Sequence, residues 1–376
     1  MPEQYSTQFS ALRRALLERP QEVIDAAGEL RDRHFGRTVT YSRKVFLPIT
    51  NLCRDRCTYC TFRRSPHDPG AWTMSPEEIA GTLDRAKAQG CKEALMCLGD
   101  RPETAFPTYR EWLARQGHRS TVGYVRRACE LALDRGILPH TNMGLLTREE
   151  MAELKEVNAS LGLMLENVSE RLRGPGMPHR FAPDKDPALR LKMLEESGQL
   201  QIPFTTGILI GIGETWDERI DSLAAIQRLH ERYGHIQEVI VQNYAPKPHL
   251  VKAPTSAPAR QDVALTIAAA RTILSPEISV QVPPNLNPGV TAQLLAAGIN
   301  DFGGISPVTQ DFINPEAPWP NLDQLAQLCS EAGYELRERL TVYPEYHTDP
   351  AWVAPAMREH IDALADPATG LARVPA

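Results

Sequence analysis

The sequence predicts an α/β protein folded as one (β/α)₈ barrel of the TIM type, with a short N-terminal helical extension and a C-terminal extension. Short apolar stretches of strand length alternate with amphipathic stretches of helix length, and this alternation repeats eight times. The strands are apolar throughout, which is typical of a parallel sheet buried on both faces. We expect the helical extension at residues 1–41, the barrel at 42–333, and a C-terminal extension packed on the barrel at 334–376.

The expected elements can be placed in order along the chain. A helical segment at residues 9–33 comes first. The eight strands are expected at residues 44–50, 93–98, 137–143, 160–166, 204–210, 236–242, 278–282 and 301–305. Helices are expected from Ser75, from about Ser120, from Thr147, and at residues 187–196, 217–233, 260–274 and 322–332. Ser75 with Glu78, and Thr147 with Glu150, have the spacing of capping boxes. After Tyr334 we expect a strand-like segment and a short helix.

Composition limits the classes of function. The 376 residues are 42% hydrophobic, enough for one large core, and the net charge is -6. An acidic balance argues against a protein that tracks nucleic-acid phosphates. No run of 18 apolar residues is present, and residues 1–20 lack the apolar core of a signal peptide. We therefore expect a cytoplasmic protein that binds neither nucleic acid nor a membrane.

The main chemical signal is a group of three cysteines directly after the first expected strand. Cys53, Cys57 and Cys60 have the spacing C-x₃-C-x₂-C. In a reducing compartment such a group indicates a metal or catalytic site, and three thiolates this close can hold three corners of a [4Fe–4S] cluster. The next cysteine is Cys91, so one iron would be left open. The alternative is a zinc-stabilised binding barrel. Structural zinc normally takes four protein ligands, and the nearest candidate for the fourth ligand is His67.

The cysteine loop resembles that of the radical S-adenosylmethionine (SAM) superfamily, in which C-x₃-C-x-aromatic-C follows the first barrel strand. The resemblance implies that the open iron binds the amino and carboxylate groups of SAM. It implies that Tyr59 packs against the adenine region, with an ordinary loop anchor as the alternative. It also implies that Gly99, Asp100 and Glu103, after the second strand, receive the methionine ammonium.

Further site residues are expected at later strand ends. The resemblance implies that Glu166 contacts the SAM ribose and that Ile210 and Gly211 lie beside the adenine. Polar residues on or after the strands are weak candidates for substrate binding or proton transfer, because the carboxyl ends of barrel strands form the active-site face. For each of them, turn chemistry or a satisfied core position is an open alternative. They are His140, Thr205, Thr206, Gln242, Asn243 and Asn285.

Within the superfamily, residues 42–346 resemble the deazaflavin-synthase branch, specifically the CofG-type subunit of 7,8-didemethyl-8-hydroxy-5-deazariboflavin (Fo) synthase. The segments that carry the resemblance are PITNLCRDRCTYCTF, GDRPE, MLEN, TTGILIGIGET, QNYAPKP, VPPNLNP and GGISPVTQDFINPEAPWP. The related CofH-type subunit typically has a Gly-Gly-x-His-Pro-like segment after the second strand, where this chain has GDRPE.

The resemblance implies a radical SAM carbon–nitrogen lyase with one [4Fe–4S] cluster. Its substrate would be 5-amino-5-(4-hydroxybenzyl)-6-(D-ribitylimino)-5,6-dihydrouracil, converted to Fo with release of ammonia, methionine and 5′-deoxyadenosine. The implied partners are a CofH-type subunit, which supplies this substrate, and a low-potential electron donor such as ferredoxin or flavodoxin. Arg54, Arg56, Arg63 and Arg64 flank the cysteines and could meet that donor, stabilise the cluster or be merely solvated. A CofH-type activity and the biotin-synthase-like and menaquinone-pathway branches remain alternatives.

Overall fold

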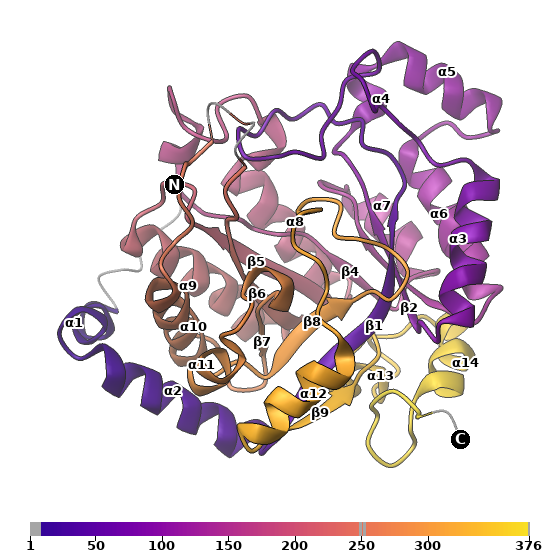
Figure 1. Cartoon of the computed structure of the whole chain (residues 1–376). Coiled ribbons are helices and arrows are strands. Elements are labelled where there is room, and N and C mark those ends of the chain that lie inside the picture. The colour runs from indigo at the N-terminus through magenta and orange to yellow at the C-terminus, as the bar shows by residue number, and fades with distance from the viewer. Residues whose placement is uncertain (1–8, 248–249, 251–252, 375–376) are drawn as a thin grey trace.

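The structure, a computed structural model, describes residues 9–247, 250 and 253–374. Its centre is a closed barrel of eight parallel strands surrounded by helices, which confirms the predicted fold (Figure 1). The strands follow one another around the barrel in sequence order, and β1 closes it by pairing with both β2 and β8. They are β1 (Thr38–Pro48), β2 (Glu93–Cys97), β3 (Leu138–Asn142), β4 (Ser160–Gly162), β5 (Phe204–Ile210), β6 (Ile236–Asn243), β7 (Ser279–Gln281) and β8 (Asp301–Ile305).

Helices cover the outside of the barrel, and each helix buries one of its faces against the strands. The two predicted capping boxes are present, Ser75 with Glu78 and Thr147 with Glu150. The helices between strands are α3 (Pro76–Ala88), α4 (Pro102–Ala105), α5 (Pro107–Arg115), α6 (Thr121–Leu133), α7 (Arg148–Lys155), α8 (Pro187–Gln199), α9 (Trp216–Tyr233), α10 (Arg260–Ile273) and α11 (Thr291–Ala296), with α12 (Leu322–Glu331) after β8. Short 3₁₀ turns occur at Glu170–Arg173, Pro183–Lys185 and Pro284–Leu286.

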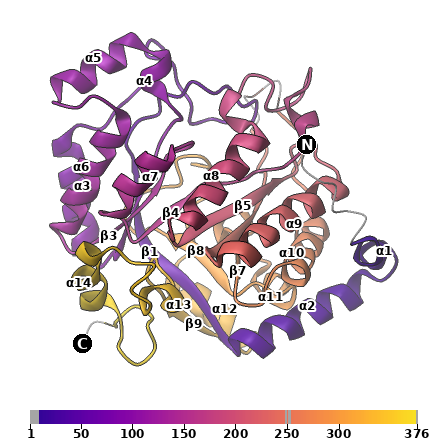
Figure 2. The same cartoon turned by 180° about the vertical axis from the view of Figure 1, so that it is seen from behind.

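The N-terminal helical segment is split in two, which corrects the single stretch expected at 9–33. The helices are α1 (Ser10–Glu18) and α2 (Pro20–Phe35), and Arg19 between them has a φ of -140°. A residue before proline disfavours the helical conformation, so the break falls at Arg19. In the views of Figures 1 and 2, α2 runs along the outside of the barrel beside α10 and α11. Residues 1–8 of the expected extension lie outside the described residues, as does Pro248 of the segment QNYAPKP.

Two strands, β1 and β4, differ from their predictions by more than one residue at an end. β1 begins at Thr38, earlier than the expected residue 44, because its first residues pair with an additional strand, β9 (Glu335–Glu338). β4 ends at Gly162 instead of residue 166. Glu166 has a φ of 65°, in the left-handed region, so it contributes only an isolated bridge to Ile208.

The segment after β9 covers the amino-terminal end of the barrel. It continues into α13 (Pro344–His347) and α14 (Pro355–Leu364). Apolar residues of this segment, including Leu340 and Val342, form a cluster with Leu138 of β3 and with Ala159. In Figure 2 the same segment lies beside β3 and β1. The barrel is therefore closed at its amino end, and its strands open only toward their carboxyl ends.

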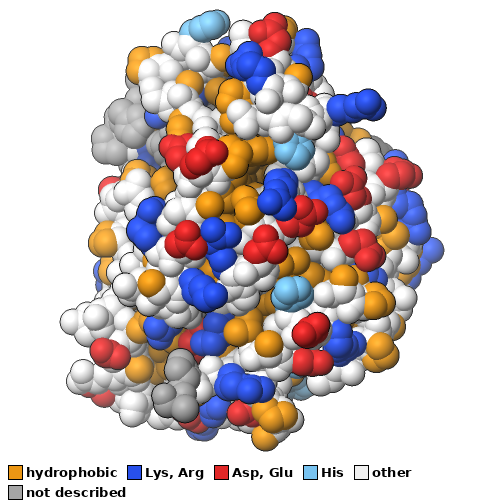
Figure 3. All heavy atoms as spheres, turned by 90° about the vertical axis from the view of Figure 1, so that its right-hand side faces the viewer, with side chains coloured by type: hydrophobic (Ala, Val, Ile, Leu, Met, Phe, Trp, Pro, Cys, Tyr) orange, Lys and Arg blue, Asp and Glu red, His pale blue; other side chains and the backbone are white. Residues whose placement is uncertain are grey.

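The surface over α3, α6 and α14 carries both signs of charge. Figure 3 shows Lys and Arg interspersed with Asp and Glu across this face. Among the described residues, no helix has the length and hydrophobicity needed to cross a bilayer.

Candidate active site

A pocket of about 390 Å³ opens at the carboxyl ends of the barrel strands and extends into the barrel. Its walls come from strand-end loops and from side chains on the strands themselves. Because parallel strands end at one edge, loops that are far apart in the sequence meet here. The loops after β1, β2, β4 and β8 supply Cys53, Asp100, Glu166 and Asp311.

The three predicted cysteines face this pocket together. Cys53, Cys57 and Cys60 are partly exposed and all line it. The backbone N–H of Asp100 donates to Sγ of Cys53 at 3.1 Å, and the N–H of Cys60 donates to the carbonyl of Cys57 at 3.2 Å. The loop is anchored from outside the barrel sheet, since the N–H of Arg56 donates to the carbonyl of Phe181 at 2.8 Å.

The chemistry of these thiols suits a metal cluster. Burial raises the pKa of the Cys53 thiol to about 12, and burial also raises the pKa of Cys57. A bound metal ion lowers such a pKa strongly, because only the thiolate is a ligand. Cys97 also lines the pocket, but it is the last residue of β2 and does not belong to the loop that carries the three cysteines. The donor set therefore fits a cluster held by three protein sulfurs.

Asp100 presents an unpaired acceptor beside the cysteines. Its Oδ2 accepts from the N–H of Leu145 at 3.2 Å, while Oδ1 is buried without a partner in the structure. Burial, with the negative charge of Asp184 nearby, raises the pKa of Asp100 to about 7. A buried acceptor without a donor is costly unless a ligand supplies one. Asp100 is thus suited to a cationic N–H donor bound beside Cys53.

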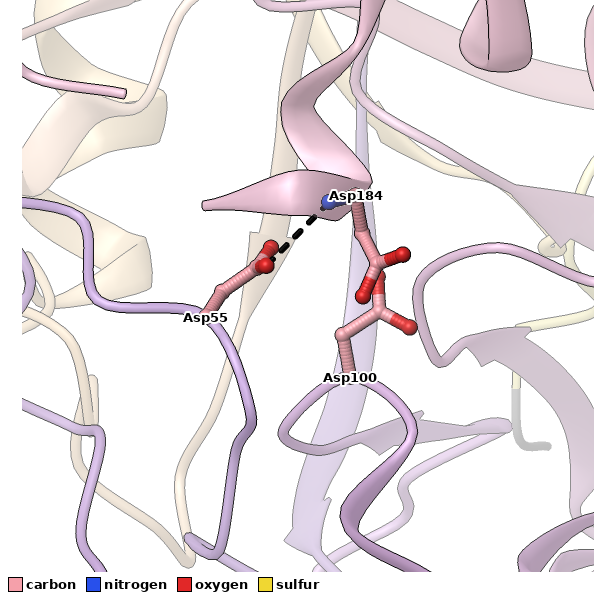
Figure 4. Close-up of side chains that lie close together, drawn as sticks. All are labelled: Asp55, Asp100 and Asp184. Carbon is pink, nitrogen blue, oxygen red and sulfur yellow. Dashed lines mark hydrogen bonds between the residues drawn. The ribbon is translucent and has the colours of Figure 1, made fainter. Parts of the chain in front are cut away.

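Asp55, Asp100 and Asp184 form a buried group of carboxylates, which point toward one another in Figure 4. One oxygen of each lies within 4.8 Å of the others. Arg54 donates to both oxygens of Asp184, and Asp55 accepts from the N–H of Asp184 at 3.2 Å. Arg54 therefore holds the cysteine loop against the 3₁₀ turn at Pro183–Lys185.

Tyr59 and Glu166, which were expected to contact the cofactor, also line the pocket. The hydroxyl of Tyr59 lies 2.9 Å from Nε2 of His179. Glu166 is paired with Lys185. Although burial opposes it, Lys185 and Arg190 hold the pKa of Glu166 below its usual value, so the carboxylate is charged.

Three of the residues expected near the cofactor do not line this pocket. Glu103 does not line the pocket, because its carboxylate caps α6: it accepts from the hydroxyl of Thr121 at 2.7 Å and from its N–H at 3.3 Å. Ile210 is fully buried in the hydrophobic core. Gly211 donates its N–H to Glu214 at 2.8 Å and packs against Pro258, outside the pocket lining.

Most of the weak candidates line the pocket, namely His140, Thr205, Gln242, Asn243 and Asn285. Thr206 does not; its hydroxyl accepts from the N–H of Leu165 at 3.3 Å. Burial lowers the pKa of His140 to about 4, so its ring is neutral near pH 7, with Nδ1 2.7 Å from the Ser160 hydroxyl. Asn285 donates to Asp311 at 3.0 Å, while its Oδ1 is buried without a partner in the structure.

The sequence reasoning missed several charged residues of the pocket. Lys185 and Arg190 lie beside Glu166, and both line the pocket. Deeper in the barrel, the lining includes Lys44, Glu93, Glu238 and Arg339. A charged residue within an otherwise apolar strand is the signal that could have revealed Glu93 and Glu238, since such a side chain is seldom buried without a purpose.

Comparison with known proteins is consistent with this geometry. Residues 47–226 match the family model of the radical SAM superfamily. The chain is 49% identical to the 7,8-didemethyl-8-hydroxy-5-deazariboflavin synthase of Methanopyrus kandleri, over 87% of this chain and 98% of that protein. It is 50% identical to the FO synthase of Mycobacterium tuberculosis over 89% of this chain, which spans 40% of that longer protein.

Solved structures with a similar fold are more distant in sequence. The hydrogenase maturase HydG from Carboxydothermus hydrogenoformans superimposes with a TM-score of 0.68 at 17% identity, covering 84% of this chain and 72% of its own. Methylornithine synthase (PylB) gives a TM-score of 0.63 at 19% identity, covering 84% of this chain and 88% of its own. At these identities the likeness shows the fold.

Proposed function

The chain belongs to the radical SAM superfamily and, within it, to the 7,8-didemethyl-8-hydroxy-5-deazariboflavin (Fo) synthases, and on this basis we propose that it is the CofG-type enzyme. It would act as a carbon–nitrogen lyase that completes Fo from 5-amino-5-(4-hydroxybenzyl)-6-(D-ribitylimino)-5,6-dihydrouracil and releases ammonia, methionine and 5′-deoxyadenosine. The observation that carries the proposal is the meeting of Cys53, Cys57, Cys60 and the unpaired Asp100 oxygen in one pocket.

The residues present fit the two cofactors of this class. Cys53, Cys57 and Cys60 would hold a [4Fe–4S] cluster with one iron left for SAM. When bound, the cluster and SAM supply the 5′-deoxyadenosyl radical that abstracts hydrogen from the substrate. The protein's own task is to position that hydrogen and to exclude other donors, and a pocket closed at the amino end of the barrel serves both.

Charged groups around the cysteines match the ends of SAM. Asp100 would accept from the methionine ammonium through its unpaired Oδ1. Lys185 contacts Oε1 of Glu166, which leaves Oε2 for the ribose hydroxyls. Arg190, whose Nε donates to the carbonyl of Asp184 at 2.8 Å, would place a positive charge near the methionine carboxylate of SAM.

Two partners follow from this chemistry. A CofH-type subunit would supply the substrate, and a low-potential carrier such as ferredoxin or flavodoxin would supply one electron. Arg56 is exposed in the cysteine loop, next to Phe181, whose side chain is 63% exposed, so this edge of the loop is accessible to a protein donor.

The cluster assignment is tested by replacing one ligand. After anaerobic reconstitution, the wild type should bind about four irons per chain. Cys57→Ala should lose the cluster and the formation of 5′-deoxyadenosine, whereas Cys329→Ala, a buried core cysteine on α12, should keep both. Full iron content and an intact cluster spectrum in Cys57→Ala would refute the ligand assignment.

The substrate assignment is tested by turnover. Holoenzyme with SAM and reductant is given either the hydroxybenzyl-aminodihydrouracil or a mixture of tyrosine and ribityl-diaminouracil. We expect fluorescent Fo from the first only. Consumption of the second pair without formation of Fo would instead assign the CofH-type reaction.

A further inference from the structure

The inner end of the pocket is polar, although apolar layers usually fill a (β/α)₈ barrel. We call this region the polar floor. It consists of Lys44, Glu93, Glu238, Gln281 and Arg339. The first four lie on β1, β2, β6 and β7, and Arg339 directly follows β9. The cysteines follow the carboxyl end of β1, whereas Lys44 and Glu93 are level with each other near the amino end of β2, so the floor and the cysteines are at opposite ends of one pocket.

Each charge of the polar floor is paired, as its burial requires. Nζ of Lys44 lies 2.7 Å from Oε1 of Glu93. Arg339 lies 3.1 Å from Glu238, which also accepts from the hydroxyl of Thr205 at 3.0 Å. An ammonium has three N–H donors and a carboxylate about four acceptor positions, so these pairs keep hydrogen-bonding capacity for a ligand in the cavity.

The end of β8 makes room for two of these side chains. A Cβ at Gly304 would lie 1.7 Å from Cε of Lys44. A Cβ at Gly303, whose φ is +67°, would lie 2.3 Å from Nε2 of Gln281. The two glycines thus allow Lys44 and Gln281 to reach the cavity.

In the pocket lining Lys44 and Arg339 lie against Glu93 and Glu238, and Asp301, outside the lining, is a second partner of Arg339. The floor therefore presents donors and acceptors side by side instead of a single sign of charge with which to select an ion. It suits an uncharged chain of hydroxyl groups, because each hydroxyl can donate to a carboxylate and accept from a cation or an amide. Phe46, two residues after Lys44 on β1, is stacked on Trp319 at 5.1 Å and lines the same pocket nearer its mouth.

We propose that the polar floor binds the polyhydroxyl chain of the substrate and so directs its ring system toward the three cysteines. This inference rests on the proposed function, whose substrate carries a ribityl chain. The floor then determines specificity for that chain, and Arg339 makes the segment after the barrel part of the binding site.

The test is a comparison of two ligands on reconstituted holoenzyme with SAM and without reductant, so that no turnover occurs. The ligands are the hydroxybenzyl-aminodihydrouracil and its analogue with ethyl in place of ribityl, and binding is followed by tryptophan fluorescence, since Trp319 lines the pocket. The wild type should bind the ribityl compound at least about tenfold more tightly, the effect of one or two net hydrogen bonds.

Two variants remove parts of the floor. Gln281→Met, and Lys44→Met combined with Glu93→Gln so that no buried charge is left alone, should each reduce this preference about tenfold while binding of the ethyl analogue stays unchanged. Gln227→Met is the control, because Gln227 lies on α9, donates to the Ser275 hydroxyl at 2.8 Å and does not line the pocket.

The proposal is overturned if the wild type shows no preference for the ribityl compound, if the floor variants retain the full preference, or if they weaken both ligands equally. Failure of the proposed function would appear separately, as the absence of Fo in the turnover assay with wild-type enzyme, because the binding comparison needs no reaction.

Discussion

Asp100 contributes to the site through both its backbone and its side chain. Its backbone N–H donates to Cys53, so the residue must stay against the cysteine loop, while its carboxyl group is buried with Asp184 nearby. Burial and like charge both favour the protonated form. A bound cation would reverse this, because a charge-assisted hydrogen bond favours the carboxylate.

Asp100→Asn should therefore weaken SAM binding. The amide keeps the size of the side chain and the backbone contact with Cys53 but removes the negative charge that faces the ammonium. We expect the Kd for SAM to rise about 10- to 100-fold, the loss of a charged hydrogen bond. Equilibrium dialysis with reconstituted protein measures it.

Glu103→Gln is the informative comparison for Asp100. Because Glu103 caps α6 through Thr121, its substitution should lower stability by about 1 kcal/mol and leave the Kd for SAM unchanged. A weaker SAM affinity in Glu103→Gln with wild-type affinity in Asp100→Asn would instead support the sequence-based prediction that Glu103 contacts SAM.

His235 gives the fold a defined response to acid. The side chain is fully buried between α9 and β6, against Phe204 and Tyr233, and burial lowers its pKa to about 3. Between this value and about 6.5, the unfolded chain binds a proton that the folded chain does not. The stability that the neutral ring contributes is present above pH 6.5 and is lost as the pH falls toward 3.

His235→Phe should remove this dependence. As the pH falls from 6.5 to 4.5, the free energy of unfolding of the wild type should drop relative to the variant by about 1.4 kcal/mol per pH unit. Urea titrations at several pH values measure the difference. His67→Gln, at an exposed position, should follow the wild type; a constant gap between wild type and His235→Phe would contradict the assignment.

Residue-scale prediction from sequence succeeded where spacing fixes geometry. Three cysteines within one loop necessarily lie close together, and all three reach the pocket. Strand position alone did not reveal side-chain direction: Thr205 and Thr206 are adjacent on β5, yet only Thr205 lines the pocket, since successive side chains on a strand point to opposite faces. The position of Arg339 in the pocket could not be predicted, because the local sequence does not indicate which strands a distant segment will pack against.

At the scale of elements, the cysteine loop and the loop after β2 are in direct backbone contact. The N–H of Gly99 donates to the carbonyl of Thr50 at 3.0 Å. A Cβ at Gly99 would lie 2.0 Å from the carbonyl oxygen of Leu52 and 2.6 Å from Cβ of Cys53. Glycine is therefore required at this position by the approach of two loops, in addition to any contact with a cofactor.

Gly99→Ala should displace the cysteine loop from the barrel edge. We expect a loss of about 1–3 kcal/mol in stability, as for overpacking elsewhere, together with a low iron content after reconstitution. Gly123→Ala in α6 is the control, because its Cβ would meet only atoms 3.6 Å away, and helix propensity should raise stability by up to about 1 kcal/mol. Normal iron content in Gly99→Ala would show that the close approach can relax.

The alternation of patterns predicted the elements well because each strand and helix has its own local signal. β5 and β8 have the predicted bounds, and the caps at Ser75 and Thr147 form as expected. β9 was expected only as a strand-like segment of the tail; its partner is β1, and pairing across so long a separation has no local signature.

At the scale of the whole molecule, Arg339 joins the chain after the barrel to the barrel interior. Its guanidinium lies 2.6 Å from Asp301 of β8 and 3.1 Å from Glu238 of β6, and all three side chains are buried. Removing one member of such a network leaves the others charged and without compensation, which is more harmful than replacing the whole network by neutral groups.

Arg339→Met should therefore be strongly destabilising. We expect a loss of about 3–5 kcal/mol in the free energy of unfolding, because Asp301 would lose its charged partner while buried. Glu238 would lose the cation that opposes the rise of its pKa, which burial brings to about 7, and would be buried as the neutral acid. Combining it with Asp301→Asn and Glu238→Gln should recover most of that loss, since amides are far less costly to bury than unpaired carboxylates. Urea unfolding measures both variants. A loss of less than about 1 kcal/mol in Arg339→Met alone, the range of an exposed ion pair, would contradict this expectation. The segment after β9 would then be held by its apolar contacts with Leu138 and Ala159, and Arg339 would contribute to the pocket but not to stability.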